Sequence, residues 1–107
     1  MTVVETQFDE MFYDALAEFC KGQAHPKRLM ILHLLMNGEK SVGEIAETLK
    51  IGQPTVSQHL NYMKRSGVVK SRREGNIVYY SLADRRIAQA CSIITQVVKE
   101  KLIKPKH

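Results

Sequence analysis

Residues 53–65 read QPTVSQHLNYMKR, and this stretch decides the fold. Pro54 suits the first turn of a helix, where its missing N–H costs no intrahelical hydrogen bond. Apolar residues recur at the i, i+4, i+7 spacing of one buried helix face, at Val56, Leu60 and Met63. The other positions carry side chains that form hydrogen bonds or a positive charge. The stretch therefore predicts a helix with an apolar inner face and a polar outer face.

A second short helix is expected directly before this one. Ser41 and Glu44 have the capping-box spacing, in which each side chain bonds the backbone N–H of the other residue. The apolar positions that follow have helical spacing: Val42, Ile45, Ala46 and Leu49. A short break over residues 51–53 separates the two helices. Two short helices joined in this way predict a helix-turn-helix over residues 41–66.

The period of the sequence changes after Gly67. Residues 68–72 and 77–82 are rich in β-branched and aromatic side chains, which favour strands. Between them lies Arg73-Glu74-Gly75-Asn76, a segment with a turn-forming glycine. The pattern predicts a β-hairpin over residues 68–82, immediately after the helix-turn-helix.

Amphipathic helices are expected at both ends of the chain. Residues 8–19 repeat apolar side chains on one helical face, and Gly22 is expected to end a first helix over residues 1–22. Asp84 is expected to cap a last helix over residues 84–104. The apolar stripe of that helix is Ile87, Ala90, Cys91, Ile94, Val97, Val98 and Leu102.

One more helix completes a single domain over residues 1–107. Pro26 opens it, and the run from Leu29 to Met36 is almost unbroken apolar sequence, as in a central, buried helix. The predicted fold is mainly α with a β-hairpin. Its order is helix, helix, helix, helix, strand, strand, helix.

Charge is unevenly distributed along the chain, whose formal net charge is +5. Residues 1–20 hold five acids and no Lys or Arg, whereas residues 62–73 hold five basic residues and no acid. A basic cluster inside a globular domain suits a polyanion, first of all DNA. On charge alone, a solvated charged face is the alternative.

The composition and the first residues of the chain indicate where in the cell the protein is found. No apolar run approaches the roughly 18 residues of a membrane span, and the first residues lack the basic and apolar regions of a secretory signal. Two cysteines are too few for a disulfide framework. We therefore expect a cytoplasmic protein without a membrane partner.

The polar face of residues 53–65 matches the chemistry of DNA recognition. No acid occurs from Gln53 to Arg73, so no carboxylate there repels phosphate. Gln and Asn fit the adenine edge, Ser and Thr bond bases or phosphate, and the first residues of a helix in the major groove reach base edges first. The DNA-binding residues expected on this helix are Gln53, Thr55, Ser57, Gln58, His59, Lys64 and Arg65.

The hairpin adds basic residues beside that helix. A basic hairpin next to a reading helix is a wing, which lies on phosphates or in the neighbouring minor groove. Phosphate contacts contribute much of the affinity and make it fall steeply with salt. The wing contacts expected here are Lys70, Arg72, Arg73 and Asn76.

Two other classes of function are alternatives to DNA binding. A winged helix also serves as a protein-interaction module without DNA binding, and the absence of acids over residues 53–73 argues against that use. An enzyme is not expected. The sequence has no Gly-rich phosphate loop and no nucleophile with a matching base.

Four segments between residues 20 and 84 together resemble the arsenic-repressor (ArsR/SmtB) family of transcription factors. They are AHPKRL (24–29), SVGEIA (41–46), VSQHL (56–60) and REGNIVYYSL (73–82). The resemblance implies a winged helix-turn-helix homodimer on double-stranded operator DNA, with the first and last helices at the interface. It also implies a repressor that an effector releases. The family often has Gly where this chain has Lys50, so we expect either strain or a slightly different turn there.

The metal sites that the resemblance implies are incomplete in this chain. Residues 39–44 lack the cysteine pair of members that bind metal on the third helix. For zinc on the last helix, Asp84 and Glu100 match, but Arg86 and Val97 stand where imidazoles are needed and cannot ligate Zn²⁺. We expect no cofactor at either position.

Cys20 and Cys91 remain as candidates for the effector site. If the first and last helices pack together, the two sulfurs come within disulfide reach. We hypothesise a thiol switch driven by an oxidant or reactive sulfur, similar to the sulfur-responsive branch of the family, although that branch places its cysteines elsewhere. A metal or metalloid held by both thiols and His33 is one alternative, and a pair of buried small hydrophobes is another. His33 is otherwise expected in the core, bonded to backbone.

Overall fold

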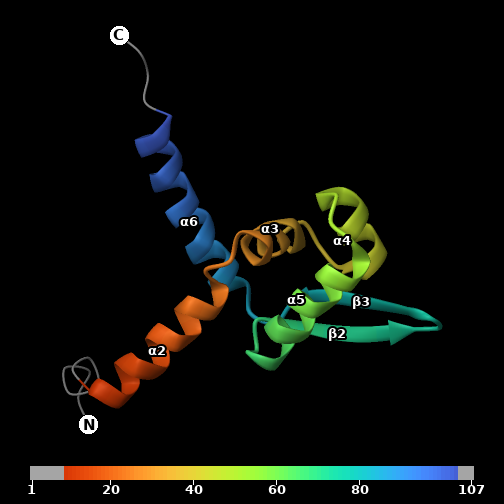
Figure 1. The fold of residues 1–107 in the computed structure, drawn as a ribbon, viewed down its shortest axis with the longest axis horizontal. Coiled ribbons are helices and arrows are strands. Elements are labelled where there is room, and N and C mark those ends of the chain that lie inside the picture. Colours follow the sequence, from red (N-terminus) through yellow and green to blue (C-terminus); the bar gives the residue numbers. More distant parts are fainter. Residues whose placement is uncertain (1–8, 104–107) are drawn as a thin grey trace.

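The computed structural model of this protein describes residues 9–103. In Figure 1, α3, α4, α5 and the hairpin pack together, and α2 and α6 extend from them as two arms. In chain order the elements are α2 (Glu10–Gln23), α3 (Pro26–Leu35), β1 (Lys40–Ser41), α4 (Val42–Leu49), α5 (Gln53–Arg65), β2 (Val69–Glu74), β3 (Ile77–Leu82) and α6 (Arg85–Leu102). The predicted fold is confirmed, with one addition: the two-residue strand β1, which is too short to leave a pattern in the sequence.

The core lies where α3, α4, α5 and the sheet meet. Its largest fully buried side chains come from the three helices and from Val68, directly before β2: Ile31, Leu32, Leu35, Ile45, Val56, Leu60, Met63 and Val68. Burying a side chain of this size is worth roughly 1.5–3 kcal/mol. The expected apolar inner face of α5 is therefore its buried face, and α3 is the central helix that its unbroken apolar run predicts.

Helix α4 begins with a capping box and ends in a tight turn that leads to α5. The predicted capping box is present: Ser41 Oγ accepts from the Glu44 N–H at 3.1 Å, and a Glu44 carboxylate oxygen accepts from the Ser41 N–H at 2.8 Å. This pairing lowers the pKa of Glu44. α4 ends at Lys50, which adopts the left-handed conformation with φ 58°. The turn keeps its shape, and Lys50 bears the strain that a glycine would avoid.

The wing is a hairpin with a two-residue turn. Glu74 and Ile77 form the last pair of β2 and β3, so Gly75 and Asn76 alone make the turn. The predicted connection of four residues is therefore two residues too long, because Arg73 and Glu74 continue the strand. Gly75 has φ +63°, which L side chains rarely adopt. β1 pairs with the other edge of β3, and the sheet order is β1-β3-β2.

The two arms carry large apolar side chains into solvent. Each begins with an aspartate cap: Asp9 accepts from the Met11 N–H at 3.0 Å, and Asp84 accepts from the Arg86 N–H at 2.9 Å. Contiguous exposed apolar surface marks an interaction site. The exposed apolar side chains of the arms are Met11, Phe12, Tyr13, Leu16, Ile93, Ile94, Val97, Val98 and Leu102.

The ends of these arms differ from the prediction in one respect. α2 ends at Gln23 and not at Gly22. Gly22 lies inside the helix, and its lack of a side chain lets Tyr62 of α5 pack against it, since a Cβ there would overlap the Tyr62 hydroxyl. Residues 1–8 of the predicted first helix and residue 104 of the predicted last helix lie outside the described residues. Within the described part, no helix has the length and apolarity needed to cross a membrane.

We expect Lys50→Gly to raise the free energy of unfolding by about 0.5–1 kcal/mol, because the relief of left-handed strain exceeds the entropy that glycine adds to the unfolded chain. Urea unfolding measures it. Glu47→Gly, at an exposed position inside α4, is the control and should lower stability by about 1 kcal/mol. A loss in Lys50→Gly equal to that of the control would contradict the assignment of strain.

Candidate nucleic-acid interface

The outer face of α5 is a polar stripe. Gln58, Asn61 and Arg65 follow at i, i+3 and i+7, and all three are exposed on the side opposite the buried face. Gln53 and Lys64 are exposed beside them. The helix begins without a side-chain cap and without an acid in its first turn, so its positive dipole end faces outward uncompensated. This surface combines hydrogen-bonding groups with positive charge.

Asn61 was not among the predicted contacts. Its signal in the sequence is its position three residues after Gln58, on the side of the helix opposite Val56, Leu60 and Met63. The predicted base contacts lie in the first half of the helix, and Asn61 lies beyond them.

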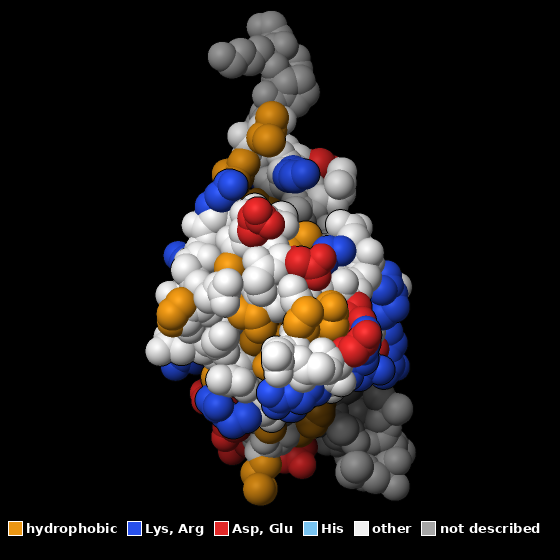
Figure 2. Space-filling model, turned by 90° about the vertical axis from the view of Figure 1, so that its right-hand side faces the viewer, with side chains coloured by type: hydrophobic (Ala, Val, Ile, Leu, Met, Phe, Trp, Pro, Cys, Tyr) orange, Lys and Arg blue, Asp and Glu red, His pale blue; other side chains and the backbone are white. Residues whose placement is uncertain are grey.

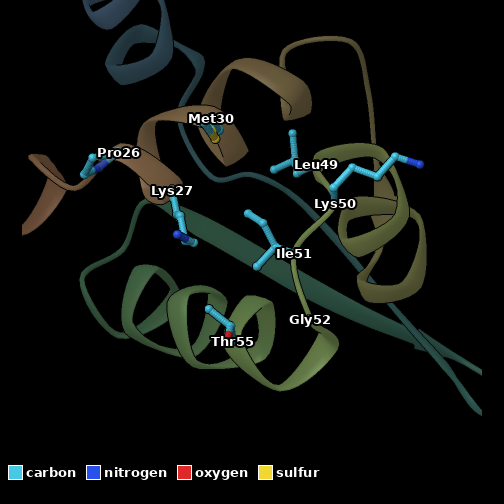
Figure 3. Close-up of a pocket in the computed structure, with 8 residues that line it drawn as sticks. All are labelled: Pro26, Lys27, Met30, Leu49, Lys50, Ile51, Gly52 and Thr55. Carbon is cyan, nitrogen blue, oxygen red and sulfur yellow. The ribbon is translucent and has the colours of Figure 1, made fainter.

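Three predicted contacts lie on the flanks of α5. Thr55, Ser57 and His59 are each half-buried. Thr55 lines a groove of about 480 Å³ between the start of α3, the end of α4 and the start of α5. In Figure 3, Lys27 extends from α3 toward α5 across this groove, whereas Lys50 points away from it. Lys27, which is not among the predicted contacts, thus adds a positive charge beside α5.

Arg28 of α3 joins the end of α2 to α5. Its guanidinium lies over the Tyr62 ring, 3.8 Å from the ring centroid, and its Nε donates to His59 Nδ1 at 3.2 Å. Another guanidinium nitrogen donates to the Gly22 carbonyl oxygen. Because Gly22 also packs against Tyr62, the first arm is attached directly to the helix that carries the polar stripe.

The same cluster lowers the pKa of His59. Burial lowers the pKa of His59, and the neighbouring His25, Arg28 and Lys27 lower it further. The His25 and His59 rings lie 4.5 Å apart, centroid to centroid. Since Nδ1 of His59 accepts from Arg28, a second proton on that ring would displace the hydrogen bond. His59 is therefore directed toward α3 and holds α5 against it.

The predicted wing residues have different surroundings. Arg72 is held by two carboxylates: it donates to both oxygens of Glu39 at 2.7 Å and to Glu74 at 2.6 Å. Its guanidinium also lies over the Tyr79 ring. The hydrogen bond from Arg72 is the main reason that the pKa of Glu39 is lowered, and the two acids raise the pKa of Arg72. Much of the positive charge of Arg72 is thus neutralised within the protein.

The other predicted wing residues are exposed. Arg73 bonds the Gly75 carbonyl oxygen through Nε at 3.1 Å, and Lys70 and Asn76 are exposed. Figure 2 looks at the face that contains the tip of the wing and shows Lys and Arg side chains along its lower and right-hand edges. The wing therefore places positive side chains beside α5. Among the described residues, Arg72 forms ion pairs with carboxylates and Arg73 forms none.

The two cysteines lie on one pocket. Cys20 of α2 and Cys91 of α6 both line a pocket of about 380 Å³ between the arms and α3, and both are free thiols. Cys20 is exposed and Cys91 is half-buried. Burial raises the pKa of Cys91, and the nearby Cys20 raises it further. The two helices thus bring both thiols to the lining of one pocket.

The other candidate ligands are engaged elsewhere. His33 Nε2 lies 3.3 Å from the Thr95 hydroxyl of α6, so its partner is a side chain and not the expected backbone group. Asp84 caps α6 and forms an ion pair with Arg86 at 2.6 Å, which lowers the pKa of Asp84 to about 2. Among the described residues no three His, Cys, Asp or Glu side chains form a cluster that could hold a metal ion.

This fold, with a polar helix beside a basic hairpin, defines a winged helix-turn-helix protein. Residues 25–71 match the family model described as "Bacterial regulatory protein, arsR family". An uncharacterised HTH-type transcriptional regulator of Methanocaldococcus jannaschii is 41% identical over 86 residues, which are 79% of this chain and 97% of the relative. The chain belongs to the ArsR family of DNA-binding transcriptional regulators, which are not enzymes, and the resemblance seen in the sequence is confirmed.

Solved structures agree with this assignment. A homodimeric winged helix-turn-helix DNA-binding domain of Mycobacterium bovis, described as a possible ArsR-family regulator, superposes with a TM-score of 0.77 at 34% identity, covering 91% of this chain and 90% of that one. The transcriptional repressor BigR from Xylella fastidiosa superposes with a TM-score of 0.73 at 32% identity, covering 99% and 100%.

Because the pKa of His59 is lowered, the folded state binds fewer protons at this site than the unfolded state. Its stabilising contribution is complete above the unfolded pKa of about 6.5 and is lost as the pH falls toward the folded value. In His59→Asn the amide oxygen keeps an acceptor near Nδ1 without titrating. We expect urea unfolding between pH 7.5 and 5.5 to show a smaller acid loss in this variant. Equal losses would refute the role given to His59.

Proposed function

We propose that this protein is a sequence-specific transcriptional repressor that binds double-stranded DNA as a homodimer and is released from its operator by an effector. The observation that carries this proposal is the exposed stripe of Gln58, Asn61 and Arg65 on α5, next to a basic wing. No carboxylate occurs in the sequence from Gln53 to Arg73. The relative BigR is itself described as a repressor.

Within this proposal, α5 lies in the major groove. Gln58 and Asn61 offer the paired donor and acceptor that fit the adenine edge, while Gln53 and Ser57 lie near the start of the helix, which enters first. Lys64 and Arg65 follow at the end of the helix and suit phosphates. Thr55 and His59 lie on the flank toward α3, so they support the position of the helix more than they read bases.

The wing completes the contact with the duplex. Arg73, Lys70 and Asn76 reach the phosphates or the neighbouring minor groove, where arginine is favoured. Arg72 has a smaller part because Glu39 and Glu74 already hold its guanidinium.

The arms are the proposed dimer interface. Their exposed apolar side chains lie on α2 and α6, and burying them against a second copy removes apolar area from water. The Mycobacterium bovis relative is described as homodimeric. A two-fold dimer places two α5 helices on half-sites about one helical turn of DNA apart.

The DNA contacts are tested on a duplex selected from a random pool and on a scrambled duplex, over a series of salt concentrations. We expect Arg73→Ala to weaken binding to both duplexes and to reduce the salt slope by about 1. Arg72→Ala is the matched control and should change both less. Gln58→Ala should cost about 1–3 kcal/mol on the selected duplex and little on the scrambled one. Equal losses on both duplexes for Gln58→Ala and Arg73→Ala would overturn sequence-specific reading.

The effector that we propose is a thiol-directed signal at Cys20 and Cys91. Both thiols line one pocket, and Cys20 is exposed, so an oxidant or a reactive sulfur species reaches it. A disulfide between them passes two protons and two electrons to the oxidant and ties α2 to α6. A metal or metalloid held by the same thiols is the alternative, because soft ligands of this type also bind such ions.

We expect an oxidant or a persulfide donor to lower the affinity of the wild-type protein for the selected duplex, and Cys20→Ser and Cys91→Ser to abolish the response. A parallel titration with Zn²⁺ and arsenite tests the alternative. If no treatment changes the affinity, the thiol switch is wrong. The proposed DNA-binding function is then tested by the titrations with the selected and scrambled duplexes alone.

A further inference from the structure

One side chain of the wing, that of Arg72, crosses the whole width of the sheet. Arg72 of β2 and Tyr79 of β3 are cross-strand partners, so their side chains lie on the same face. On its other side Tyr79 pairs with Ser41 of β1. Because β1 and β2 are the two edges of the sheet, they lie roughly 10 Å apart, which is two strand spacings. The guanidinium of Arg72 passes over the Tyr79 ring, 4.6 Å from its centroid, and reaches Glu39, directly before β1.

Glu39 holds Arg72 more firmly than an ordinary surface carboxylate would. Both of its oxygens accept from Arg72 at 2.7 Å, the bidentate geometry that makes such a pair strong. Isolated exposed ion pairs contribute little, whereas bidentate pairs within a network are the exception. Glu74 adds a single bond at 2.6 Å, but its side chain is 69% exposed against 31% for Glu39. Glu39 is therefore the principal partner of Arg72.

Arg72 lies where a free arginine would meet DNA. Alternate residues of a strand share one face of the sheet, so Arg72 lies on the same face as Lys70 and closer to the tip of the wing. The two strands β2 and β3 extend together beyond the helices to that tip (Figure 1). Lys70 on one side and Arg73 on the other are proposed above as phosphate contacts. A free guanidinium between them has the geometry and the charge to bind a phosphate.

We propose that Glu39 sets the strength of DNA binding by withholding Arg72 from the phosphate backbone. A phosphate offers Arg72 the same two acceptor oxygens as Glu39, so the exchange of partners gains no hydrogen bond. The exchange also leaves the carboxylates of Glu39 and Glu74 unpaired beside the negative backbone, and like charges repel. The wing thus forms one phosphate contact fewer than its cations would allow. This inference rests on the DNA-binding surface proposed above.

The proposal is tested by titrating the full chain with the selected and the scrambled duplex at 50 to 200 mM salt. Glu39→Gln keeps the size of the side chain and releases Arg72. We expect this variant to bind both duplexes about threefold more tightly at 50 mM, with a salt slope steeper by about 0.9, the value of one phosphate contact. Its affinity should then fall about 3.5-fold more than that of the wild type up to 200 mM. The gain should be equal on the two duplexes, because phosphates carry no sequence information.

Two controls separate the release of Arg72 from the mere loss of an acid. Glu47→Gln removes an exposed carboxylate of α4 that lies outside the Arg72 cluster, and we expect its salt slope to equal that of the wild type. In the double variant Glu39→Gln/Arg72→Ala no guanidinium is released, so its slope should equal that of Arg72→Ala alone. A steeper slope that persists in the double variant would overturn the proposal, because the gain would then come from the lost carboxylate itself.

The remaining outcomes distinguish this proposal from the function on which it rests. Glu39→Ala also removes the carboxylate and should steepen the slope as Glu39→Gln does, and thermal unfolding checks that both variants are folded. An unchanged or shallower slope in both, with the wild-type protein binding DNA, would overturn the role of Glu39. Failure of the wild-type protein to bind either duplex would instead contradict the proposed DNA-binding function.

Discussion

The burial of one face of α5 is the constraint on which the rest of the structure depends. Val56, Leu60 and Met63 have no exposed surface, and they meet α3 and the sheet in the core. A rotation of α5 about its axis would expose these side chains and bury polar ones, both at a large cost in free energy. The core therefore determines that Gln58 and Asn61 face solvent, and the reading surface is a consequence of packing.

The end of the first arm, α2, is attached directly to α5. Gly22 and Arg28 place the end of α2 on Tyr62, so the surface proposed for dimerisation and the surface proposed for DNA are joined through few contacts. A change at the arms, such as the thiol reaction proposed above, thereby has a short route to α5.

Much of the fold follows from periodicity and local chemistry in the sequence. The spacing of the apolar residues in α5, the capping box at Ser41 and the glycine at position 75 each specify a local structure without tertiary information. The candidate site is less predictable from the sequence. A polar residue in a sequence does not reveal whether its hydrogen-bonding groups are already paired with other side chains in the folded protein. Arg72 meets Glu39, and His59 meets Arg28, across more than 30 residues of chain. Asn61 is different, because its place opposite Val56, Leu60 and Met63 can be read from the sequence, although it is not among the predicted contacts.

The central claim is that the outer face of α5 and the tip of the wing contact a DNA duplex. An NMR titration of the ¹⁵N-labelled full chain with a selected duplex tests it most directly. The account predicts that the largest changes in amide chemical shift occur at Gln58, Asn61, Arg65 and the turn at Gly75, while the apolar stripe of α6 is unaffected. Changes confined to α2 and α6, with α5 unmoved, would contradict the account.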